Sequence, residues 1–187
     1  FNNTYNINQN NSISYSSSFS TTDYNVTSSN DANEPEDANN DIYSASVGYN
    51  YTFSDVNLIS SKISYTEKHA LKNYNAYTGP GFNIGFTRIL PFGIFKLDKT
   101  FQTNTYEEKN TFIHSTINRE DDIETSRIQL SGRITQLLPF MKKLDPENKI
   151  FFNLNHTKID SESTLLNNTA IRKNTSFNII KRFSLYE

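Results

Sequence analysis

The stretch that decides the fold is residues 43–53, YSASVGYNYTF. Its odd positions, from Tyr43 to Phe53, are apolar or aromatic, and its even positions are Ser, Gly, Asn and Thr. Because successive side chains of a β-strand point to opposite faces, this segment has one apolar and one polar face. The alternation recurs in segments of about ten residues, which is typical of transmembrane barrels. We therefore expect an all-β chain that forms an antiparallel outer-membrane β-barrel.

The composition fits a barrel better than a soluble sandwich. Only 35% of the 187 residues are apolar, and the mean hydropathy is −0.65. A barrel with a watery lumen needs apolar residues on its outside only, whereas a sandwich needs a sealed core. The 14 Phe and 11 Tyr residues suit aromatic girdles at membrane interfaces. A net charge of −2 argues against nucleic-acid binding, and the lack of Cys excludes disulfides and thiolate metal sites.

We expect nine strands whose connections alternate between tight turns and longer segments. This alternation is typical of barrels with short periplasmic turns and long external loops. The expected strands are residues 1–9, 11–24, 41–54, 56–67, 81–90, 93–106, 122–137, 148–160 and 168–186. The expected long loops are 25–40, 67–80, 107–121 and 160–167, and 138–147 is a longer periplasmic turn.

An odd strand count has a consequence for the barrel. Single-chain bacterial barrels normally have an even number of strands, and nine strands alone would leave two open edges in lipid. We therefore expect residues 1–187 to form one barrel domain that is incomplete on its N-terminal side. The missing strands would lie upstream of Phe1 or on a partner chain. The sequence has neither an initiator Met nor a signal peptide, which predicts processing or a longer parent chain.

Position parity assigns a set of charged residues to the lumen. These residues share a phase with Asn, Gln and Ser neighbours, so the lumen wall would be net cationic. The wall would attract anions, or its charges would pair with the missing strands or with a plug. The predicted lumen-facing residues are Lys62, Lys96, Asp98, Arg127, Arg133 and Arg182. Lys99 is an exception, because it takes the lipid-facing phase and must snorkel or follow a bulge.

We expect no catalytic residue, metal site or cofactor. His156 has Asp160 and Ser161 nearby, as in outer-membrane lipid hydrolases, but on a strand it takes the lipid-facing phase. The acidic segments 30–41 and 119–122 lack the ligand spacing of a calcium loop and are expected to be solvated loop tips. Residues 79–81, Gly-Pro-Gly, are expected to form a turn.

The second part of the chain contains several short motifs. They include Tyr77 with Gly79 before a strand, Tyr106 at a strand end, Arg119 with Asp121, and the strand IQLSGR at 128–133. Over roughly residues 75–187 this pattern resembles the C-terminal barrel of surface lipoprotein assembly modifiers. The resemblance implies a barrel of about fourteen strands behind a periplasmic helical-repeat domain, which helps lipoproteins reach the cell surface.

The expected function is therefore export or surface display of proteins or lipoproteins. The barrel would be a non-catalytic conduit or docking scaffold in the bacterial outer membrane. Its partners would be outer-membrane lipid and a protein or lipoprotein cargo, and not nucleic acid. The alternative is a passive, porin-like diffusion channel with a partly cationic lumen. A soluble adhesin sheet would share the polar composition but not the aromatic residues at both ends of the apolar stripes.

Overall fold

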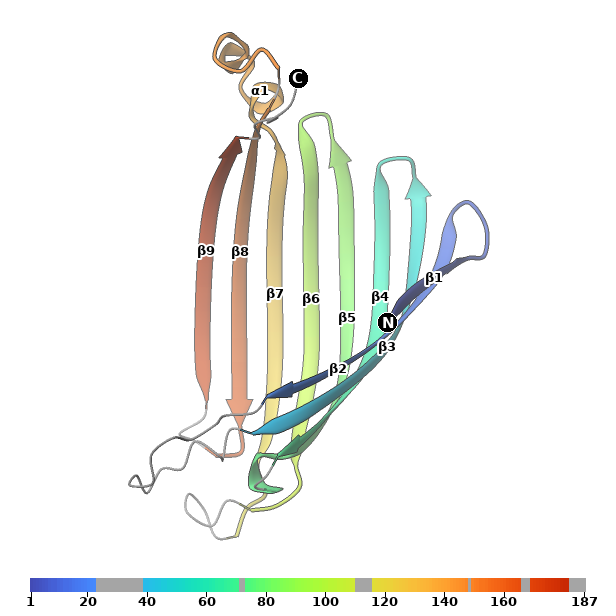
Figure 1. The fold of residues 1–187 in the computed structure, drawn as a ribbon, viewed down its shortest axis with the longest axis vertical. Helices are drawn as coiled ribbons and strands as arrows, with labels where there is room; N and C mark the ends of the chain where they lie inside the picture. The colour runs from blue at the N-terminus through green and yellow to red at the C-terminus, as the bar shows by residue number, and fades with distance from the viewer. Residues whose placement is uncertain (23–38, 71–72, 110–115, 148, 166–168, 182–187) are drawn as a thin grey trace.

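Nine strands form a single antiparallel sheet in chain order in the computed structural model (Figure 1). The strands are β1 (Asn2–Asn6), β2 (Asn11–Thr22), β3 (Asn40–Ser54), β4 (Asn57–Ala70), β5 (Tyr77–Leu90), β6 (Gly93–Tyr106), β7 (Glu120–Arg133), β8 (Ile150–Ser163) and β9 (Ala170–Lys181). The structure describes residues 1–22, 39–70, 73–109, 116–147, 149–165 and 169–181. The all-β prediction is confirmed. The sheet is not closed, because β1 and β9 remain its two edges.

The connections fall at two ends of the sheet (Figure 1). Tight turns join β1 to β2, β3 to β4 and β5 to β6 at the upper end, which we call the short-turn end. The same end carries the small helices α1 (Ile134–Leu137) and η3 (Pro139–Lys143). The opposite end, the loop end, carries the other connections, including η2 (Asn73–Asn75). None of the helices in the described residues is long and apolar enough to cross a membrane.

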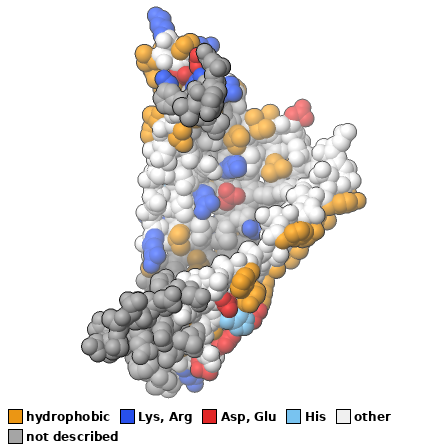
Figure 2. All heavy atoms as spheres, viewed as in Figure 1, with side chains coloured by type: hydrophobic (Ala, Val, Ile, Leu, Met, Phe, Trp, Pro, Cys, Tyr) orange, Lys and Arg blue, Asp and Glu red, His pale blue; other side chains and the backbone are white. Residues whose placement is uncertain are grey.

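The two faces of the sheet differ in polarity because residues paired across strands share a face. One continuous row across β2 to β9 is polar or Gly throughout: Ser12, Asn50, Ser60, Gly85, Asp98, Arg127, Thr157 and Asn174. A row on the other face is largely apolar in its centre: Tyr51, Ile59, Phe86, Leu97 and Ile128. Figure 2 looks into the hollow of the sheet, where mostly polar side chains and a few charged ones are visible. We call this polar face concave and the apolar face convex.

Glycines on the concave face show how little room that face has. A Cβ on Gly81 would lie 2.6 Å from Ser64 Oγ, and one on Gly85 would lie 2.5 Å from Ser60 Oγ. Side chains converge on the inside of a curved sheet and diverge on its outside. The sequence therefore has Gly and Ser on the inside and aromatic residues on the outside.

The sheet has no core of its own. Among the described residues only five hydrophobic side chains are buried, and they lie near the ends of the sheet: Ala76, Tyr106, Ile134, Phe152 and Leu165. Large convex side chains in the middle of the sheet are exposed, including Ile63, Phe82 and Ile128. An apolar sheet face normally packs against a second layer. No element in the described part of the chain supplies that layer.

The expected loop at 67–80 is much shorter than predicted. Strand β4 continues to Ala70 and β5 begins at Tyr77, because Thr66 pairs with Gly79 and Tyr65 with Pro80. The Gly-Pro-Gly segment is therefore part of a strand and not a turn. A Cβ on Gly79 would lie 2.5 Å from Asn104 Oδ1, so the buried side chain of Asn104 would have to move to admit a larger residue there. Because Pro has no N–H, the β5–β6 ladder is interrupted at this point.

The predicted strand 122–137 ends four residues early. Ile134 to Leu137 form α1, and Pro139 begins η3. The chain returns to β8 at Asp145, which is 3% exposed and accepts hydrogen bonds from the backbone N–H groups of Lys149 (3.0 Å) and Ile150 (2.8 Å). Ile134, which continues the alternation of Ile128 and Leu130, is buried within this connection.

The closest strand contact gives a direct test of the register. Gly93 and Gly132 face one another, and a Cβ on Gly132 would lie 1.9 Å from the backbone oxygen of Phe92. We expect Gly132→Ala to lower the free energy of unfolding by about 1–3 kcal/mol, because backbone and not a side chain must move. Denaturant unfolding measures this. Gly48→Ala is the control, because its nearest atom is the movable Ser14 Oγ at 2.8 Å. Equal losses in the two variants would contradict the register.

Candidate functional site

The charged residues predicted for the lumen lie on the concave face wherever the structure describes them. The register puts Lys62, Lys96, Asp98, Arg127 and Arg133 on that face. Arg182 lies outside the described residues. Lys62, Lys96 and Arg127 are exposed, so their charges are available to a ligand or a partner.

Three of these charges form a compact group on β6 and β7. Asp98 is directly opposite Arg127, and Lys96 is directly opposite Gln129. Lys96 and Arg127 are therefore diagonal neighbours, a separation of about 7–8 Å between backbones in an antiparallel pair. The group has a net charge of one positive unit. Lys62 on β4, two strands from β6, adds a second positive charge.

Neutral polar side chains fill the space between the charges and link adjacent strands. Asn83 donates to Thr100 Oγ1 (2.8 Å) and Gln129 donates to Asn153 Oδ1 (3.2 Å). These bonds satisfy amide groups that the crowded concave face partly removes from water. The wall is therefore polar and mostly uncharged, with isolated cations.

A second site lies at the loop end of the concave face. It consists of Tyr77, Tyr106, Arg119 and Asp121, which we call the Tyr–Arg cluster. Arg119 donates to both carboxylate oxygens of Asp121, at 3.0 Å from Nε and 2.5 Å from Nη2. Its guanidinium lies 4.3 Å from the ring centroid of Tyr106. Tyr106 donates its hydroxyl to Asp121 (3.1 Å), and its ring contacts that of Tyr77 at 5.4 Å.

The Tyr–Arg cluster is buried and its electrostatics follow from that burial. Asp121 is 4% and Tyr106 is 8% exposed. Burial alone would raise the pKa of Asp121, but hydrogen bonds from Arg119, Ser163 and Tyr106 lower it below the ordinary value. Burial also raises the pKa of Tyr106 to about 12. Asp121 is therefore a carboxylate and Tyr106 a neutral donor at physiological pH.

The cluster anchors the chain at the loop end. The backbone N–H of Tyr106 donates to the oxygen of Arg119 (3.0 Å), and that of Glu107 donates to the oxygen of Ala76 (3.1 Å). The segment 119–122 was expected to be a solvated loop tip, and this prediction is wrong. Asp121 belongs to β7, where its carboxylate is held by a bidentate pair.

The sequence singled out these residues only as motifs of a resemblance. Arg119 and Asp121 are two positions apart, so on a strand they share a face, and this spacing was the available signal. Their partners come from β5 and β6, and the sequence pattern alone does not show that contact.

The other candidates lie apart from both sites. His156 is on the convex face and its Nδ1 lies 2.7 Å from Thr175 Oγ1, whereas Ser161 is on the opposite face of β8. Lys99, the misfit of the lipid-facing phase, pairs with Glu124 Oε1 at 2.9 Å and follows an uninterrupted register, so no bulge occurs there. Within the described residues, no three His, Cys, Asp or Glu side chains are grouped so that they could hold a metal ion.

Comparison with known proteins adds no assignment. No family model matches the chain, and no curated protein matches it closely enough to count as a relative. Its function is therefore argued from its own residues.

Arg119 offers a test of the Tyr–Arg cluster. We expect Arg119→Gln to lower the free energy of unfolding by about 2–3 kcal/mol, because it leaves the buried carboxylate of Asp121 without its cation. Denaturant unfolding measures the loss. The control is Lys149→Gln, which breaks an exposed pair with Glu147 and should cost less than about 1 kcal/mol. A loss no larger than that of the control would show that the cluster does not anchor the loop end.

Proposed function

We propose that the sheet is part of the wall of a β-barrel in the bacterial outer membrane, with the convex face toward lipid and the concave face toward a lumen. The observation that carries this proposal is the uncovered convex face. In water, its exposed Ile, Phe and Leu side chains would make an apolar surface far larger than soluble monomers normally expose. In a bilayer the hydrocarbon replaces the missing second layer.

The direction of the apolar band supports this proposal. Toward the loop end, the first charged convex residue is Glu67 on β4 and Lys158 on β8. The hydrogen-bonded row of Glu67 runs through Thr78, Thr105 and Glu120 to Thr164. The edge of the band has therefore shifted by six residues between β4 and β8, and Lys99 on β6 already lies in the row of Lys158.

This shift corresponds to a strand tilt. Six residues extend about 20 Å along a strand, and the four strand spacings from β4 to β8 cover about 19 Å, so the mean inclination of the band to the hydrogen-bonded rows is about 45°. Strands of transmembrane barrels tilt by about 35–45° from the barrel axis. A horizontal membrane would meet this sheet along such an oblique band.

The edge strands must also be paired in lipid. Unsatisfied N–H and C=O groups in hydrocarbon cost several kcal/mol each. We propose that β1 and β9 are completed by further strands, upstream in the same protein or on a partner chain.

Within this barrel we propose a non-catalytic role in export or surface display of proteins or lipoproteins. The polar, mostly uncharged concave wall suits passage or docking of a polypeptide. The Tyr–Arg cluster adds support. Tyr77, Tyr106, Arg119 and Asp121 are among the residues that carry the resemblance to surface lipoprotein assembly modifiers, and they contact one another. The partners would be outer-membrane lipid and a protein or lipoprotein cargo. Cells that lack this protein should lose cargo from the protease-accessible surface while total cargo stays constant.

The second candidate is a porin-like diffusion channel. It is favoured by the exposed concave cations Lys62, Lys96 and Arg127, which would attract small anions.

Neighbouring residues on opposite faces test the membrane orientation. We expect Ile128→Lys to prevent stable membrane integration, because a cation on the lipid side costs about 2–4 kcal/mol at the midplane. Gln129→Lys, one position along and on the concave face, should integrate normally. The measurement is the carbonate-resistant membrane fraction of each variant. In a soluble sheet Ile128, which is 44% exposed, would tolerate Lys as well as Gln129 does, and that result would refute the barrel.

Charge reversal on the concave face separates the two functions. For a diffusion channel, Arg127→Glu with Arg133→Glu should shift ion selectivity in planar bilayers toward cations. For an export barrel with an occluded lumen, conductance should stay near zero in both forms while surface display of cargo falls. An open channel whose selectivity ignores both changes would mean that these arginines do not face the lumen.

A further inference from the structure

A row of lysines crosses the convex face from β6 to β9. Lys99, Lys158 and Lys173 occupy one hydrogen-bonded row, in which Ser126 separates the first two. Lys158 and Lys173 are directly opposite one another on β8 and β9. Like charges in directly opposed positions destabilise a sheet, unless an anion lies between them.

The partners of these lysines leave one charge unmatched. Lys99 pairs with Glu124 and Lys158 pairs with Asp160. Lys173 has no ion pair among the described residues. Lys173 is therefore the member of the pair whose charge no carboxylate in the described part of the chain neutralises directly, and the next convex pair toward the short-turn end is His156 with Thr175.

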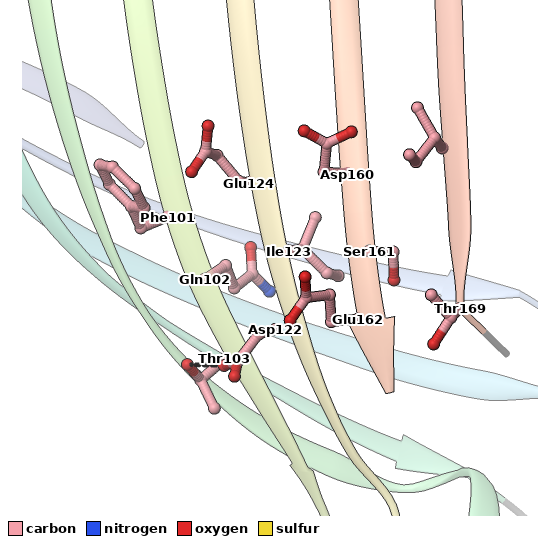
Figure 3. A pocket seen from close by; sticks show the side chains of 11 residues that line it. Phe101, Gln102, Thr103, Asp122, Ile123, Glu124, Asp160, Ser161, Glu162 and Thr169 are labelled. Carbon is pink, nitrogen blue, oxygen red and sulfur yellow. Dashed lines mark hydrogen bonds between the residues drawn. The ribbon is translucent and has the colours of Figure 1, made fainter. Parts of the chain in front are cut away.

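The surroundings favour an anion that arrives from the membrane and not from water. Toward the short-turn end, Leu154 and Phe177 face each other on the convex surface and offer contact to acyl chains. Toward the loop end lie four carboxylates, so charge alone would hold a free anion only weakly: Asp122, Glu124, Asp160 and Glu162 (Figure 3). A lipid headgroup feels the same carboxylates but gains additional binding free energy from the contacts of its acyl chains.

We propose that Lys158 and Lys173 bind the phosphate of a phosphorylated lipid headgroup at the membrane surface, with Leu154 and Phe177 against its acyl chains. This inference rests on the proposed barrel. It adds to it a defined lipid contact on β8 and β9, at the level where the hydrocarbon ends. A cation near an anionic membrane surface strengthens binding by about fivefold.

The absence of Trp from the chain allows a local measurement. Phe177→Trp places the only indole of residues 1–187 beside the lysine pair, in protein reconstituted in phosphatidylcholine vesicles with any Trp outside these residues replaced by Phe. Quenching by acyl-brominated phosphatidic acid is compared with quenching by acyl-brominated phosphatidylcholine. We expect a preference for phosphatidic acid of about fivefold for each lysine. The preference should disappear in Lys158→Gln with Lys173→Gln and persist with Arg at both positions.

Control positions separate the possible outcomes. Ile63→Trp, on the convex face of β4 away from the lysines, should be quenched by both lipids without preference. Equal quenching by both lipids at Phe177→Trp would overturn the lipid site and leave the barrel standing. No quenching by either lipid at both Trp positions would overturn the barrel itself. Loss of the preference on adding inorganic phosphate would assign the lysines to a free anion and overturn the lipid proposal.

Discussion

The ladder of hydrogen bonds between neighbouring strands holds this protein together. A soluble domain of this size is stabilised by a buried apolar core, but this sheet is one layer thick and buries only five hydrophobic side chains in its described part. Backbone pairing therefore fixes every other feature. It decides which side chains share a face, where the two glycines Gly93 and Gly132 must meet, and which charges oppose each other. The apolar side chains become stabilising only when an environment outside the sheet covers them.

Much of this arrangement follows from alternation in the sequence. Segments such as 43–53 predict both a strand and its two faces, because a period of two is hard to reconcile with a helix. The prediction fails where local signals have another cause. Gly79 and Pro80 favour a turn in the sequence, yet both lie inside β5, where Gly79 is close to the side chain of Asn104. Ile134 continues the alternation of β7, but the chain has already turned into α1.

The candidate sites were less predictable than the strands. Parity alone places Lys62 and Arg127 on one face, because their orientation depends only on their own strands. The Tyr–Arg cluster depends on three strand ends meeting at the loop end. Asp121 looked like one more acid in an exposed segment, since its neighbours are Glu120 and Asp122. Its burial comes from Tyr106 and Arg119, which are brought together by the pairing of β6 with β7.

The chain-order topology also has a kinetic consequence. Every strand pairs with the strand that precedes or follows it in the sequence, and no described strand waits for a distant partner. Each step of such a meander closes only the connection to the neighbouring strand, so each new strand can add to the edge formed by the strand before it. The strands can then pair one after another in chain order. For the proposed barrel, the slow step would be the single event that joins β1 and β9 to the strands that complete it.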